Sequence, residues 1–192
     1  MDRRKNLLIG LVVGIVIVGT MVYATGSAER LLSPFGVSAE YESSESAIAP
    51  ELAAGDWINS EPLRLEDLRG RVVLVEFWTF GCINCRNTLP HVQGWHDRYR
   101  DKGLTVIGVH SPEFAEERDV EHLRREVSSL GITYAVVTDN DYRTWNAYDV
   151  YAWPTSFLLD KQGRIRWKHV GEGDYEEGER QIQQLLAEKE AL

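Results

Sequence analysis

The sequence is poor in cysteine and in basic side chains, and each shortage removes a class of function. Only two of its 192 residues are cysteines, and its five histidines are scattered. A structural zinc site usually needs four such ligands at short spacing, so we expect no metal. Lysine and arginine number 21 against 30 aspartates and glutamates, which gives a formal net charge of −9. A chain this acidic is not expected to bind nucleic acid through the phosphates.

Long uncharged apolar segments are equally scarce, and one lies near the N-terminus. The residues from Leu7 to Ala24 carry no charge and follow the basic cluster Arg3-Arg4-Lys5. Their length is at the short end of what crosses a bilayer, and the basic cluster predicts a cytoplasmic N-terminus. We therefore expect a membrane anchor over residues 1–24, with the rest on the extracytoplasmic (periplasmic or cell-surface) side. A cleaved signal peptide is the alternative, because Gly26-Ser27-Ala28 offers small residues.

The remainder divides into a linker and one folded domain. Residues 25–54 are rich in serine, alanine and glutamate without a sustained period, which is typical of a linker. Residues 55–192 alternate apolar runs with helical patterns, which predicts a mixed α/β sheet with helices on both faces. The expected strands are 56–59, 63–65, 72–78, 104–109, 133–137, 155–159 and 164–170. The expected helices are 83–100, 116–129, 145–148 and 174–189.

Both cysteines lie in one short motif, Cys82-Ile83-Asn84-Cys85, between an apolar strand and a helix. This position puts the first sulfur at a helix N-terminus, where unpaired N–H groups and the helix dipole favour a thiolate. The thiolate is the nucleophile of thiol–disulfide exchange, and the second cysteine can then attack the mixed disulfide. The motif therefore predicts a redox dithiol in which Cys82 attacks and Cys85 resolves.

Other uses of the cysteine pair fit less well. A c-type haem needs histidine directly after the second cysteine, where Arg86 stands. An inert disulfide is disfavoured because so short a loop adds little stability. A thiol-dependent, peroxiredoxin-like peroxidase using Thr79 and Cys82 is an alternative, although Val75 occupies the place of the expected proline. A non-catalytic tethered module that binds client peptides is a third possibility.

The chain from about Pro50 to Leu186 resembles the thioredoxin superfamily. Within it, the match is to membrane-tethered redoxins of the TlpA and ResA kind, above all to the thioredoxin-like domain of DipZ-type proteins. The motifs that carry the resemblance are Trp57-Ile58-Asn59-Ser60, Val75 to Cys85, Gly108 to Phe114, Asp139 to Tyr142, Trp153-Pro154-Thr155 and Gly171 to Tyr175. It implies a thioredoxin-like fold and an extracytoplasmic thiol–disulfide oxidoreductase without a cofactor, acting on client proteins.

The resemblance also implies partners and roles for individual residues. DipZ-type proteins carry a multi-helix membrane module, so we expect a separate membrane electron donor or acceptor here; apocytochrome c is one family client, which suggests cytochrome c biogenesis. Glu76 matches a buried carboxylate beneath the dithiol, whose raised pKa would let it take the proton of Cys85. Pro154 matches a cis-proline that exposes the preceding backbone for pairing with a client. The expected client-binding residues are Trp78, Trp153, Pro154 and Thr155.

Overall fold

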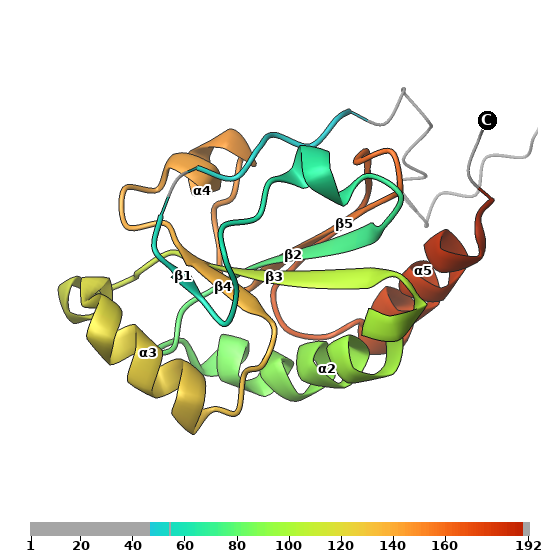
Figure 1. Cartoon of the computed structure of the whole chain (residues 1–192). Helices are drawn as coiled ribbons and strands as arrows, with labels where there is room; N and C mark the ends of the chain where they lie inside the picture. Colours follow the sequence, from blue (N-terminus) through green and yellow to red (C-terminus); the bar gives the residue numbers. More distant parts are fainter. Residues whose placement is uncertain (1–46, 54, 190–192) are drawn as a thin grey trace, which may run out of the picture. The chain divides into compact units, whose positions relative to one another are not determined.

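The computed structural model describes residues 47–53 and 55–189, so the predicted anchor lies outside the described ranges. Six strands form one sheet in the order β1-β4-β3-β2-β5-β6 (Figure 1). The strands are β1 (Trp57–Ile58), β2 (Val72–Trp78), β3 (Leu104–His110), β4 (Ala135–Thr138), β5 (Thr155–Leu159) and β6 (Ile165–Val170). The α-helices are α2 (Ile83–Tyr99), α3 (Val120–Ser129), α4 (Arg143–Ala147) and α5 (Tyr175–Ala187). The 3-10 turns are η1 (Leu65–Leu68), η2 (Arg100–Lys102) and η3 (Ala115–Arg118). Within the described ranges, no helix is both long and apolar enough to cross a bilayer.

Strand β2 is the centre of the sheet. Every one of its residues is buried, as the continuous apolar run predicted for a strand covered on both faces. It pairs parallel with β3 and antiparallel with β5, which makes the sheet mixed. The register sets Glu76 opposite Gly108 on β3 and opposite Ser156 on β5.

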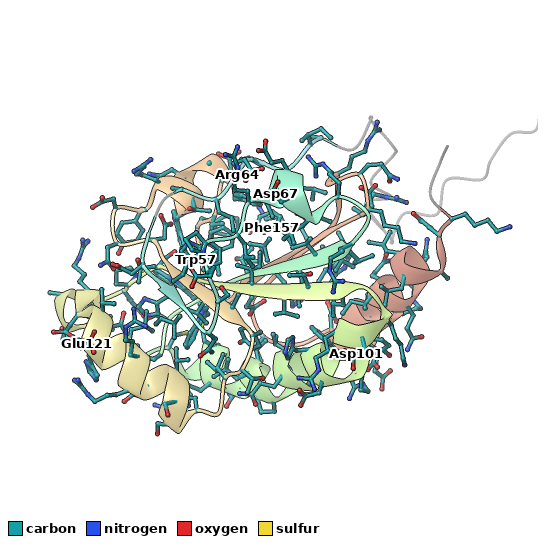
Figure 2. The ribbon with its side chains drawn as sticks, viewed as in Figure 1. Trp57, Arg64, Asp67, Asp101, Glu121 and Phe157 are labelled. Carbon is teal, nitrogen blue, oxygen red and sulfur yellow. The ribbon has the colours of Figure 1, made fainter. Side chains whose placement is uncertain are left out.

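Helices cover both faces of this sheet, as expected. One face packs against α2, α3 and α5, and the other against η1 and α4 (Figure 1). The side chains of Phe77, Trp145 and Phe157 meet on the α4 face, and Figure 2 shows Phe157 pointing into this second core. Charged residues such as Asp101 and Glu121 lie on the outside of the domain. The prediction of a mixed α/β sheet with helices on both faces is confirmed.

Two elements differ from the sequence prediction for local reasons. No strand forms over 63–65; instead, Leu65 begins the 3-10 turn η1. The carboxylate of Glu51 accepts the N–H groups of Leu65 (2.9 Å) and Glu66 (2.8 Å), which directs them away from strand pairing. The helix expected over 116–129 is split into η3 and α3, because Asp119 accepts the N–H of His122 (2.6 Å) and starts a new helix.

Residues 47–53, which the composition placed in the linker, belong to the folded domain. Ala49 donates its N–H to Gly163 (2.9 Å), and Ile165 donates to Ala47 (3.0 Å). Ile48 thereby forms an antiparallel bridge with Arg164, at the turn before β6. This backbone pairing shows that the domain begins earlier than residue 55.

Candidate active site

The two cysteines lie where the central strand passes into the first long helix. Strand β2 ends at Trp78, α2 begins at Ile83, and Cys82 is the N-cap residue of α2. The N–H groups of the first helical turn have no acceptor within the helix, and Cys82 directly precedes them. Both cysteines are free; Cys82 is partly exposed, whereas Cys85 is only 1% exposed. An attacking molecule from solvent therefore reaches Cys82 first.

Cys85 is held as a neutral thiol by its surroundings. Burial raises the pKa of Cys85 far above its ordinary value, and the backbone of Thr79 opposes this through a hydrogen bond. The neighbouring Cys82 thiol and the charge of Glu76 raise the pKa further. Cys85 therefore needs a proton acceptor before it can act as a nucleophile.

Glu76 lies in the middle of β2 with a side chain that is 1% exposed. Burial raises the pKa of this carboxyl from its ordinary value of 4.5 to about 7, and a hydrogen bond from the Ser156 hydroxyl opposes the rise. A carboxyl with this pKa exchanges its proton near neutral pH. It also contributes to the raised pKa of Cys85, which places the two groups within electrostatic reach of each other.

The side chains of Tyr134 and Trp78 lie in the same buried region. The sequence did not single out Tyr134. Tyr134 is 1% exposed, and burial raises its pKa well above the ordinary value, with Glu76 and Cys85 adding to the rise. Neither its hydroxyl nor the Trp78 indole N–H has a hydrogen-bond partner in the described part of the chain. A Cβ on Gly108 would lie 2.8 Å from the indole nitrogen of Trp78, so only glycine leaves room there.

The segment expected to hold a client lies beside the dithiol but is mostly buried. The Trp153–Pro154 peptide is cis, and Thr155 pairs with Phe77, so this segment meets the end of β2 from which the dithiol follows. Trp153 is partly exposed and donates its indole N–H to the carbonyl of Ser111 (3.0 Å). Trp78, Pro154 and Thr155 are buried, so they shape the site from within and present no open surface to a client.

Thr79 connects the dithiol to a buried histidine that the sequence analysis did not place in the site. Its hydroxyl lies 3.3 Å from Nε2 of His110, and both side chains are fully buried. Burial lowers the pKa of His110 from 6.5 to about 3, which keeps the imidazole neutral, and Phe80 stacks on the ring. The Thr79 hydroxyl that a peroxidase of this kind would use therefore contacts His110 and is fully buried.

These groups together form a two-thiol centre. An accessible sulfur at a helix start and a buried sulfur in the first turn of the same helix lie above a carboxyl that titrates near neutrality. Such an arrangement can carry out a nucleophilic attack followed by an internal one. Within residues 47–53 and 55–189, no three side chains of histidine, cysteine, aspartate or glutamate are grouped to hold a metal ion.

Comparisons with known proteins agree with this geometry. The model of the AhpC/TSA family matches residues 46–168. Protein DipZ of Mycobacterium bovis is 44% identical over 142 residues, which are 72% of this chain but 20% of DipZ. The thiol-disulfide oxidoreductase YkuV of Bacillus subtilis is 28% identical over 73% of this chain and 95% of its own length. The structure of a putative thiol:disulfide interchange protein DsbE from Chlorobium tepidum superposes with a TM-score of 0.66, at 28% identity over 74% of this chain and 97% of that one.

Proposed function

The chain belongs to the AhpC/TSA family. We propose that it is a thiol–disulfide oxidoreductase acting on client proteins through Cys82 and Cys85. The observation that carries the proposal is the contrast between the partly exposed sulfur of Cys82 and the buried sulfur of Cys85. Relatives named for thiol–disulfide exchange support it, because this chain covers nearly their whole length. The chain spans only a fifth of DipZ, so the activity of that whole protein is not carried over.

The reaction proceeds in two exchange steps. The Cys82 thiolate attacks one sulfur of a client disulfide, a mixed disulfide forms, and the other client sulfur leaves as a thiolate. The Cys85 sulfur then attacks Cys82, forms the Cys82–Cys85 disulfide and releases the second client sulfur. The client gains two electrons and the protein loses two, and the same steps in reverse oxidise a client. Each cycle therefore needs a second redox partner to restore the starting state of the dithiol.

In this scheme Glu76 is the base that takes the proton of Cys85. It is suited to the role because its pKa of about 7 lets it accept a proton at neutral pH, while Cys85 alone is held neutral by burial. Above pH 7 the carboxylate is ionised and ready to accept. Below pH 7 it is protonated, so the resolving step slows.

Replacing Glu76 by glutamine should slow the resolution of the mixed disulfide about 100-fold at pH 8, the low end of general-base effects. The wild-type rate should rise as pH passes through about 7, the pKa of Glu76, and the variant should lack this rise. For the measurement, the reduced full chain is mixed with oxidised glutathione and the reaction is quenched with acid. Mass spectrometry then distinguishes the mixed disulfide from the internal disulfide.

Glu121→Gln, which removes an exposed carboxylate on α3, is the matched control and should behave as wild type. Equal resolution rates in wild type and Glu76→Gln from pH 6 to 9 would assign Glu76 to the fold alone.

Hydrogen peroxide serves as the comparison oxidant in a test of the proposed activity. If it oxidised the dithiol faster than oxidised glutathione did, the proposal of disulfide exchange would give way to a thiol-dependent peroxidase.

We also propose that the redox domain lies outside the cytoplasm, held by an anchor over residues 1–24. The proposal rests on the uncharged segment from Leu7 to Ala24 and on the basic cluster before it. A reporter that is active only in an oxidising compartment, fused after Leu192, should therefore be active. A full-length fusion without reporter activity would contradict this location, and a mature protein beginning near Glu29 would show a cleaved signal in place of an anchor.

A further inference from the structure

Another buried carboxylate lies close to the dithiol turn, on the 3-10 turn η3. Glu117 is 2% exposed, although its neighbours Glu116 and Arg118 are exposed. Its Oε2 accepts the N–H groups of Glu113 (2.5 Å) and Phe114 (3.1 Å), which closes the turn. Its Oε1 extends away from the turn and accepts the N–H of Gly81 (3.1 Å). One carboxylate thus joins η3 to the residue directly before Cys82.

The absence of a side chain at Gly81 makes room for this contact. A Cβ at this position would lie 2.2 Å from Oε1 of Glu117, closer than two such atoms can approach. Any larger residue would therefore push the carboxylate away from the peptide N–H. Glycine is therefore required at this position, because the carboxylate occupies the space that a side chain would fill.

The turn that carries Glu117 is itself fixed to the loop that follows β4. Arg118 donates to the carbonyl of Asn140 (2.7 Å), and the Asn140 amide donates back to the carbonyl of Arg118 (3.0 Å). The Tyr142 hydroxyl donates to the carbonyl of Pro112 at the start of the same segment. Glu117 therefore holds Gly81 from a support that does not depend on the dithiol turn.

We propose that Glu117 is a positioning residue of the redox site, which holds the Gly81 peptide so that Cys82 presents its sulfur at the start of α2. The proposal rests on the assignment of Cys82 as the attacking thiol. The length of the Glu117 side chain sets the position of the Gly81 peptide, and through it the direction of the neighbouring sulfur.

Two variants test this role. Glu117→Asp shortens the reach of the carboxylate by one methylene, and Gly81→Ala displaces the carboxylate. Each is made in the full chain with Cys85→Ser, so that only Cys82 reacts. The rate of alkylation by iodoacetamide and the rate of exchange with oxidised glutathione are both measured at pH 7.

Glu117→Asp and Gly81→Ala should slow the exchange with oxidised glutathione about tenfold, and should slow alkylation as well, because the sulfur is less well directed. Glu116→Gln changes a carboxylate on the exposed face of η3 and should change neither rate. Thermal unfolding of each variant shows whether it is folded.

Undiminished exchange in folded Glu117→Asp and folded Gly81→Ala, matching Glu116→Gln, would overturn the positioning role of Glu117. The proposed function fails in a different way. If the unmutated Cys82 did not exchange with oxidised glutathione at all, disulfide exchange would be wrong, while alkylation would still report the influence of Glu117 on Cys82.

Discussion

Replacing Cys85 by serine should leave Cys82 joined covalently to its client, whereas replacing Cys82 should prevent any adduct. Cys82 is the accessible sulfur and still attacks, but the buried sulfur that completes the exchange is gone. With a peptide homodimer linked by one disulfide as the client, the Cys85→Ser chain should accumulate about one peptide per chain, and wild type essentially none. Non-reducing electrophoresis and mass spectrometry measure the adduct.

The chain with both cysteines replaced by serine is the control, and a reductant should release every adduct. If Cys82→Ser accumulated the peptide instead, the assignment of attacking and resolving thiols would be reversed. If neither single variant formed an adduct, the dithiol would not act on disulfides, and the client-binding module without catalysis would become the better interpretation.

The contribution of His110 to the stability of the fold should decrease in acid. The imidazole is buried and neutral with a pKa of about 3, whereas in the unfolded chain its pKa is near 6.5. The unfolded state therefore binds a proton as pH falls below 6.5 and the folded state does not, so stability from this group is lost as pH decreases. Between pH 6.5 and 4 this loss amounts to about 3 kcal/mol, at about 1.4 kcal/mol per pH unit.

The measurement compares the free energy of unfolding of wild type and His110→Phe from pH 7 to pH 4. The phenyl ring does not titrate and keeps an aromatic surface against Phe80. At pH 7 the variant should be less stable, because the contact with the Thr79 hydroxyl is lost. At pH 4 this difference should shrink or reverse. A constant difference across the range would show that His110 does not titrate between the two states as its burial requires.

The parts of this site that the sequence predicted are those encoded by neighbouring residues. Glu76 lies within an uninterrupted apolar run, so a buried strand carrying one carboxyl follows from that pattern alone. The helix after the dithiol follows similarly from its local periodicity. Both predictions need only the pattern of a single strand or helix.

The contacts that sequence reasoning missed join residues far apart along the chain. Thr79 meets His110 because β2 and β3 run in parallel register, and their C-terminal ends lie together. Glu117 meets Gly81 because a 3-10 turn interrupts the helix expected there. Similarly, the predicted strand over 63–65 does not form, because the Glu51 carboxylate accepts an N–H group that strand pairing would use. Such partners are set by tertiary packing and leave no periodic trace in the sequence.

The opposite pKa shifts of Glu76 and His110 have a consequence for proton exchange with solvent. Between pH 4.5 and 6.5 the folded chain holds Glu76 protonated and His110 neutral, and unfolding reverses both states. Glu76 then releases a proton while His110 binds one, so this pair contributes almost no net proton uptake to unfolding. The contributions of Glu76 and His110 to the pH dependence of the free energy of unfolding have opposite signs, so they cancel over that interval. Glu76→Gln or His110→Phe alone removes one half of the pair, and either change would make the unfolding equilibrium steeply dependent on pH.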